Sequence, residues 1–439
     1  MKVRLAPWCF LALSGAAAGS CLLNRDGLLG SESGGHGGEA ATGSGGSIVT
    51  TSSGGFGGAG GVGTGGTGVG GFGGTGGTGG GGAPPTLAAV AGGDRHSCAV
   101  RTDGQTRCWG KGTNGQLGTG TSDSSLTPVS PQGLELASTL NAGNAYSCVA
   151  LQSGSLSCWG YNFNGVLGNG TTTSSLVPIS VPGVADVAAV DAGPSHVCAV
   201  SNSGQLKCWG EGAKGQLGDG QATTSSIPVT VALANVVGVG AGFDHTCAVD
   251  STKTVSCWGD DNLGELGDGT AGTQTNTPQP VPGISDAVAV ATGTNFSCAQ
   301  HENGTVSCWG YNADGQLGTN AQVCGSCYEA NSAVVPGVSG VTQVALGFRH
   351  ACALLSTGTV SCWGDNASGQ LGNGGAPIDA PTPVAVTGLT GVVAIGAGND
   401  HTCAVVSDGT VYCWGANGDG QLGNNSTVDA SAPVMVSGL

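Results

Sequence analysis

The sequence predicts an all-β protein: a seven-bladed β-propeller with four-stranded blades, preceded by a signal peptide and a disordered, glycine-rich linker. Three observations lead to this fold class. Charged residues make up only 9% of the chain and glycine occupies 88 of its 439 positions, which favours many turns over long amphipathic helices. Pairs of cysteines recur seven times at a period of about fifty residues. Each unit contains four short segments with strand-like patterning, which is the content of one propeller blade.

The first 21 residues have the layout of a secretory signal peptide. A basic start is followed by an apolar stretch over residues 5–13 and then by small residues. The apolar stretch is too short for a membrane-spanning helix. Small residues directly precede Cys21, as at the cleavage site of a bacterial lipoprotein, so we expect Cys21 to be lipidated. Ordinary signal-peptide cleavage nearby is the alternative, because Ala18 occupies a position where lipoproteins usually have Leu.

Residues 22–86 are predicted to form a flexible linker. Between residues 34 and 82 the chain is almost entirely Gly, Thr, Ser and Ala. Such a segment cannot bury enough apolar surface to offset the loss of chain entropy on folding. We therefore expect a spacer between the N-terminus and the folded part.

The folded part, residues 87–439, consists of seven units. They run near 87–136, 137–186, 187–235, 236–286, 287–340, 341–391 and 392–439. In each unit a glycine lies five positions before the first cysteine, the second cysteine is followed by Trp-Gly, and Gly-x-Leu-Gly comes next. Because the chain ends with a strand-like segment at residues 433–436, we expect that segment to join the first unit in one blade and so fasten the ring.

The two cysteines of each unit fit a β-hairpin. Nine residues separate them, and the middle three suit a type I turn with a G1 bulge, with glycine third in six units and Lys253 third in the fourth. This register places the cysteines opposite each other, close enough for a disulfide. Buried, reduced thiols are the alternative. We expect seven bridges: Cys98–Cys108, Cys148–Cys158, Cys198–Cys208, Cys247–Cys257, Cys298–Cys308, Cys352–Cys362 and Cys403–Cys413.

The seventh unit shows the repeat most completely. It contains Ala-Gly-Asn-Asp-His-Thr-Cys-Ala-Val (397–405), Asp-Gly-Thr-Val-Tyr-Cys-Trp-Gly (408–415) and Asp-Gly-Gln-Leu-Gly-Asn (419–424). These motifs resemble the repeat of the regulator of chromosome condensation family, and the resemblance covers residues 87–439. It implies a seven-bladed propeller. The founding member is a guanine nucleotide exchange factor, whereas many relatives serve only as interaction platforms; the cysteine before each Trp-Gly departs from the family pattern.

Two repeated side chains invite functional interpretations. Histidine lies two positions before the first cysteine in five units, but Tyr146 and Phe296 replace it in the others, which favours packing over metal binding. The histidines are His96, His196, His245, His350 and His401. The tryptophan of Cys-Trp-Gly occurs once in every unit, which favours a structural role between blades over a stacking surface for sugars or bases.

The fifth unit carries an insertion with Cys324 and Cys327. Redox catalysis would require a helix start, and structural zinc would require four ligands, so we expect a small loop disulfide. The segment from Asn320 to Ala333 is the first candidate for a unit-specific contact. In the fourth unit, Asp260 and Asp261 raise the possibility of calcium, but EF-hand spacing is absent and Asp is a common turn former.

The charge and the motifs together limit the possible functions. The net charge is −16 with only 11 Lys and Arg residues, which argues against nucleic-acid binding. We expect a monomeric, exported scaffold that binds a protein or glycan, held at a bacterial cell envelope or surface by its lipid anchor, or otherwise secreted. No catalytic residue, metal or cofactor is expected, and the chain is not expected to be an enzyme. The alternative is a guanine nucleotide exchange factor-like regulator of a small GTPase, as in the founding family member.

Overall fold

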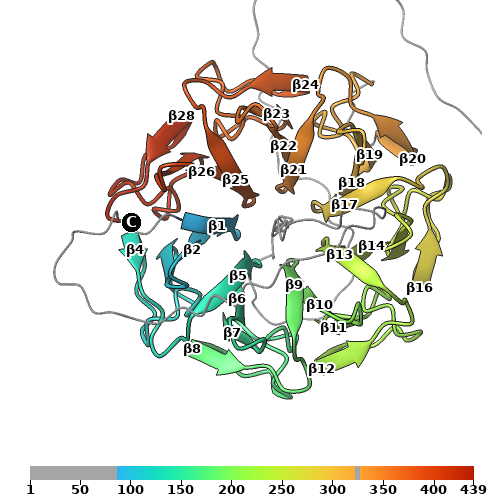
Figure 1. Cartoon of the computed structure of the whole chain (residues 1–439), viewed down its shortest axis with the longest axis horizontal. Coiled ribbons are helices and arrows are strands. Elements are labelled where there is room, and N and C mark those ends of the chain that lie inside the picture. The colour runs from blue at the N-terminus through green and yellow to red at the C-terminus, as the bar shows by residue number, and fades with distance from the viewer. Residues whose placement is uncertain (1–86, 322–326) are drawn as a thin grey trace, which may run out of the picture. The chain divides into compact units, whose positions relative to one another are not determined.

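The computed structural model describes residues 87–321 and 327–439, which form a ring of seven blades (Figure 1). The predicted signal peptide, the lipidation site Cys21, the linker and Cys324 lie outside the described residues. Within the described ranges, no helix is long and apolar enough to cross a membrane.

Each blade is an antiparallel sheet of four consecutive strands, which confirms the predicted all-β propeller of seven four-stranded blades. The first four blades contain β1 (Leu87–Gly92), β2 (His96–Arg101), β3 (Thr106–Gly110) and β4 (Ser125–Val129); β5 (Ala137–Ala142), β6 (Tyr146–Leu151), β7 (Leu156–Gly160) and β8 (Ser175–Ser180); β9 (Val187–Ala192), β10 (His196–Ser201), β11 (Leu206–Gly210) and β12 (Ser225–Thr230); β13 (Val236–Ala241), β14 (His245–Asp250), β15 (Val255–Gly259) and β16 (Thr275–Pro280). The last three contain β17 (Ala287–Thr292), β18 (Phe296–His301), β19 (Val306–Tyr311) and β20 (Tyr328–Val334); β21 (Val341–Leu346), β22 (His350–Leu355), β23 (Val360–Gly364) and β24 (Ala380–Ala385); β25 (Val392–Ala397), β26 (His401–Val406), β27 (Val411–Gly415) and β28 (Ala430–Met435).

Burial is greatest in the middle strands of each blade and lowest in the outermost strand. The second and third strands of each blade are buried along nearly their whole length, whereas the fourth strand is half-exposed throughout. The fourth strand is the edge of its sheet, and proline occurs in it in every blade but the fifth. Proline at an edge blocks further strand pairing, which keeps neighbouring molecules from adding to the sheet.

The hairpins between second and third strands have the predicted register. In every blade the two cysteines are direct partners, as for Cys98 and Cys108. The third loop residue has a positive φ, 84° at Gly104 and 67° at Lys253, as a G1 bulge requires. Opposed cysteine Cα atoms lie 4.0–4.1 Å apart, and the structure joins all seven pairs by disulfides. All fourteen of these cysteines are fully buried.

The hydrophobic core is divided into seven clusters, one at each junction between blades. Each cluster contains side chains of one blade and the tryptophan of the next, as with Leu422 of the seventh blade and Trp109 of the first. Stability therefore comes from the contacts between sheets, and every blade depends on both of its neighbours.

The ring does not close in the way that the sequence suggested. The expectation that residues 433–436 complete the first blade is wrong, because β28 pairs with β27 and belongs to the seventh blade. The first blade (β1–β4) and the seventh blade (β25–β28) each consist of four consecutive strands. Neither blade takes a strand from the other. The first and last blades instead pack face to face, with β1 beside β25 and β26 (Figure 1).

Candidate functional site

The repeated histidines and tryptophans meet at the junctions between blades. At the first junction, His96 Nε2 lies 2.9 Å from the hydroxyl of Ser147, which donates at 3.0 Å to the backbone carbonyl of Gln116. Trp159 Nε1 donates to the same carbonyl at 2.8 Å. Because the hydroxyl proton is directed at the carbonyl, the histidine must donate through Nε2. Ser147 and Trp159 thus bind their blade to the preceding one through a shared carbonyl, and His96 adds a second bond across the junction through the Ser147 hydroxyl.

The same arrangement recurs wherever a histidine is present. The Nε2 to hydroxyl distances are 2.7 Å for His196–Thr246, 2.9 Å for His245–Ser297, 2.9 Å for His350–Thr402 and 2.8 Å for His401–Ser97. At the other two junctions, Tyr146 packs near Val197 and Phe296 near Ala351. Histidine in one blade therefore always accompanies Ser or Thr in the next. This pairing is visible in the sequence, but only when each unit is compared with its successor.

Burial lowers the pKa of these histidines, to about 3 for His96 and about 4 for His350. The rings are neutral near pH 7 and uniformly buried. All seven tryptophans of the motif are also fully buried, with each Nε1 bonded to the preceding blade. The repeated residues are thus occupied in holding the ring together, and contacts with a partner must come from side chains that differ between blades.

One such feature is a pair of exposed aromatic rings on the loop after β7. Tyr161 and Phe163 are stacked with ring centroids 6.3 Å apart, and they are 42% and 70% exposed. The other six blades have only small or polar residues at the Phe163 position. Loops after third strands and turns between first and second strands lie at the same end of each blade, which we call the loop face. Large exposed rings on this face are suited to binding.

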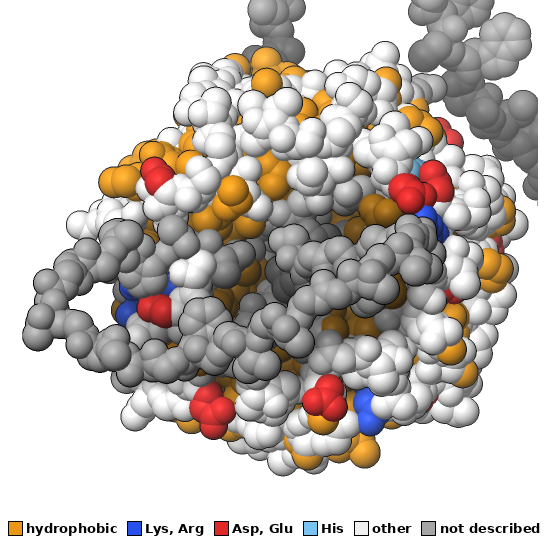
Figure 2. Space-filling model, viewed as in Figure 1, with side chains coloured by type: hydrophobic (Ala, Val, Ile, Leu, Met, Phe, Trp, Pro, Cys, Tyr) orange, Lys and Arg blue, Asp and Glu red, His pale blue; other side chains and the backbone are white. Residues whose placement is uncertain are grey.

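Charged side chains on the loop face are mostly paired. Arg349 lies 3.3 Å from Asp314 and 4.9 Å from the ring centroid of Phe348. Arg95 lies 3.4 Å from Asp419 across the closing junction. Burial is the largest cause that raises the pKa of Asp94 to about 6. On the side seen in Figure 2, basic side chains are few and form no continuous patch.

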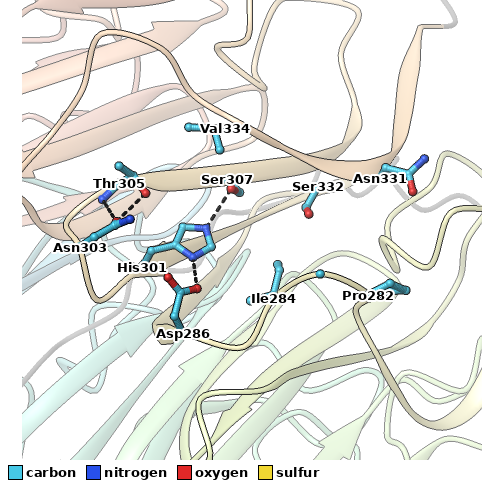
Figure 3. Close-up of a pocket in the computed structure, with 11 residues that line it drawn as sticks. Pro282, Ile284, Asp286, His301, Asn303, Thr305, Ser307, Asn331, Ser332 and Val334 are labelled. Atoms are coloured by element: carbon cyan, nitrogen blue, oxygen red, sulfur yellow. Dashed lines mark hydrogen bonds and ion pairs between the residues drawn. The ribbon is translucent and has the colours of Figure 1, made fainter.

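A second unit-specific feature is a pocket of about 480 Å³ on the fifth blade. Its walls come from residues 282–286, which connect β16 to β17, from the hairpin of β18 and β19, and from the outer strand β20. Figure 3 shows His301 between Asp286 and Ser307, with Nδ1 2.6 Å from the carboxylate and Nε2 2.9 Å from the hydroxyl. No other blade has histidine at this position.

The sequence did not reveal the cluster of Asp286, His301 and Ser307. Its members belong to the connection between β16 and β17 and to two strands, whose sequences look like those of the other repeats. The predicted contact segment 320–333 is partly involved, since Asn331 and Ser332 line the pocket. The Cys324–Cys327 bridge stays a prediction, because Cys324 lies outside the described residues.

Similar proteins agree with this architecture. Structures with a similar fold include yeast Prp20p, described together with its binding to Gsp1p and histones, with a TM-score of 0.69, 20% identity, and coverage of 81% of this chain and 88% of that one. Human WBSCR16 has a TM-score of 0.65 and 23% identity, over 73% of this chain and 87% of that one. At these identities the likeness shows the fold alone.

Sequence relatives match shorter segments. The human probable E3 ubiquitin-protein ligase HERC6 is 33% identical over 166 residues, which is 36% of this chain and 16% of HERC6. The Schizosaccharomyces pombe protein pim1 is 30% identical over 182 residues, covering 36% of this chain and 33% of pim1. Models of the regulator of chromosome condensation (RCC1) repeat match residues 88–116 and 103–150, and the RCC1-like domain model matches residues 139–439. Since the last match spans more than half of the sequence, this chain belongs to the RCC1-like domain family.

Proposed function

We propose that this chain is an exported scaffold that binds a protein or glycan partner through its loop face. The observation that carries this proposal is the stacked pair Tyr161 and Phe163, which is exposed on a ring whose repeated aromatic residues are otherwise buried. A rigid ring with variable loops allows the contact residues to differ while the junctions stay the same.

Export is supported by the seven disulfides. Disulfides form and persist in oxidising compartments and are rare in the cytosol. Together with the signal-like N-terminus they support a location at a bacterial cell envelope or surface, with lipidated Cys21 as the anchor. Intact-mass measurement of protein from the native host tests this: an acylated chain starting at Cys21 is expected, and an uncleaved chain would refute it.

The proposal includes no enzymatic activity, although Asp286, His301 and Ser307 are hydrogen-bonded to one another in the order acid, histidine, serine, as in a hydrolase triad. Ser307 lies within β19 between two paired strands, with Ala299 and Val334 as its partners. Backbone N–H groups of such a strand point along the sheet toward its neighbours, so they are not free to stabilise an oxyanion above Ser307. The cluster instead suits recognition of a polar group in the pocket. A fluorophosphonate probe is expected to leave Ser307 unlabelled.

The binding proposal is tested by partner capture from the envelope fraction of the native host with the full-length chain. The double variant Tyr161→Ala/Phe163→Ala is expected to lose the captured partner. Leu136→Ala is the matched control, because Leu136 is 48% exposed but lies at the opposite end of the blades, where its carbonyl accepts a hydrogen bond from Gln152 in the turn between β6 and β7. Equal capture by all three proteins would refute the loop face as the binding surface. Guanine nucleotide exchange on a small GTPase, implied by the family resemblance, is the alternative function and would appear as accelerated nucleotide release.

A further inference from the structure

The loops after the third strands contain a repeated amide that organises them. In the second blade, Asn162 Oδ1 accepts a hydrogen bond from the backbone of Leu167 at 2.9 Å. Its Nδ2 donates to the carbonyls of Thr171 and Thr173 at 3.1 and 3.0 Å and approaches Asn169 Oδ1 at 3.4 Å. The amide nitrogen therefore points into a space lined by three oxygen atoms.

The seventh blade repeats this arrangement closely. Asn417 Oδ1 accepts from the backbone of Leu422 at 3.0 Å. Its Nδ2 lies 3.2 Å from Asn424 Oδ1 and 3.0 Å from each of the carbonyls of Ser426 and Val428. Two hydrogen atoms on the amide nitrogen satisfy the surrounding acceptors.

The fourth blade has a carboxylate at this position. Asp261 Oδ1 accepts from the backbone of Leu266 at 3.1 Å, as the asparagines accept from Leu167 and Leu422. Its other oxygen, Oδ2, thus takes the place of the amide nitrogen. The Asp261 residue is only 1% exposed, and Oδ2 has no hydrogen-bond partner among the described residues.

One of the acceptors that surround the amide in the second blade has a carboxylate counterpart in the fourth blade. Asp268 stands where the second blade has Asn169, and its Oδ1 accepts from the backbone and hydroxyl of Thr270 at 2.8 and 2.7 Å. The Thr273 hydroxyl is close enough to the Asp261 carboxyl group to interact with it as a donor, although it lies outside normal hydrogen-bonding geometry with Oδ2. The neighbouring Asp260 is engaged elsewhere, with Lys214 Nζ at 3.3 Å. A buried carboxylate therefore lies near a second carboxylate and a hydroxyl, at a position where the second and seventh blades have an amide that donates hydrogen bonds.

We propose that this loop of the fourth blade binds a calcium ion through Asp261 Oδ2, Asp268 and oxygen atoms of residues 270–273. A cation placed there satisfies Asp261 Oδ2 and the oxygen atoms near it, as the amide hydrogens do in the second and seventh blades. Oxygen-only ligands on a loop are the donors that calcium prefers. The described residues contain no group of three or more His, Cys, Asp or Glu side chains suited to a metal, so backbone and hydroxyl oxygens must complete the coordination.

The competing explanation is a proton on Asp261, which would donate a hydrogen bond in place of the amide. The two explanations differ in their response to calcium. Two carboxylates on a loop correspond to the weaker end of protein calcium sites, with a Kd of about 10⁻⁴–10⁻³ M.

The test is calcium titration of the chelator-treated full-length protein by isothermal calorimetry, with thermal unfolding followed in parallel. The wild type is expected to bind one equivalent and to unfold at a higher temperature as calcium is added. Asp261→Asn recreates the amide of the second and seventh blades, so it is expected to fold and to bind calcium at least tenfold more weakly. Asp219→Asn is the matched control, because Asp219 occupies the Asp268 position in the third blade but faces Gly212 instead of an acid.

The control is expected to bind as the wild type does. Binding that is unchanged in Asp261→Asn would overturn the proposal, and so would a wild type whose unfolding temperature and heat of titration do not respond to calcium. If Asp261→Asn fails to fold, Asp268→Asn provides the same comparison, because it removes the second carboxylate and leaves Asp261 in place.

Discussion

The pairing of histidine with Ser or Thr across each junction can be tested at the contact between the sixth and seventh blades. His350 Nε2 lies 2.9 Å from the Thr402 hydroxyl, which donates to the Gln370 carbonyl at 3.1 Å. The contact between the fifth and sixth blades has Phe296 and Ala351 at the corresponding positions. The double variant His350→Phe/Thr402→Ala therefore converts one native junction into the other.

Each single change has a cost that the double change avoids. Thr402→Ala leaves the buried Nε2–H of His350 without an acceptor, which is expected to cost about 1–3 kcal/mol. His350→Phe removes one hydrogen bond but leaves Thr402 bonded to Gln370, so about 1 kcal/mol is expected. Phe is sterically suited here, because Gly347 leaves room for the ring just as Gly293 does beside Phe296. The double variant is expected to lie within about 1 kcal/mol of the wild type, so the coupling free energy is at least about 1 kcal/mol.

The assay is denaturant unfolding of the wild type, both single variants and the double variant without reductant. A positive coupling free energy means that the two residues act as a pair. Additive effects, with the double variant less stable than either single variant, would refute the reasoning.

Three further predictions address stability. Burial raises the pKa of Asp191 to about 7, above its unfolded value, so its contribution to stability is lost as pH rises through 7. For the wild type we expect the unfolding free energy to fall by on the order of 2–4 kcal/mol between pH 5 and pH 8. Asp191→Asn is expected to reduce this fall, which urea titration at the two pH values measures. Gly93→Ala is expected to destabilise by about 1–3 kcal/mol, because a Cβ there would lie 2.3 Å from a histidine ring, whereas Gly418→Ala meets no atom within 4 Å and should leave the melting temperature unchanged. Removing the bridge of Cys403 and Cys413 by double Ala substitution should cost about 2–3 kcal/mol in denaturant unfolding, and an unfolding free energy equal to that of the wild type would contradict its stabilising role.

The candidate site was only partly accessible from the sequence. The segment at 320–333 was expected to provide a unit-specific contact, and Asn331 and Ser332 do line a pocket. The stacked Tyr161 and Phe163 were not singled out, although their departure from the other units is visible in the sequence. The Asp286, His301 and Ser307 cluster could not be found in this way, because a linker and two strands must fold before the three side chains meet.

The sequence by itself determined the number of blades, the strands within each and the alignment of each hairpin. These features depend on contacts between residues about ten positions apart, and turn residues such as Gly104 and Lys253 record them directly. Only the tertiary structure decided how the ring closes, which hydroxyl each buried histidine meets and which acceptors surround Asp261. Those contacts join neighbouring blades or separate parts of a loop. Their partners are chosen by the packing of whole sheets, and no local pattern of residues specifies that packing.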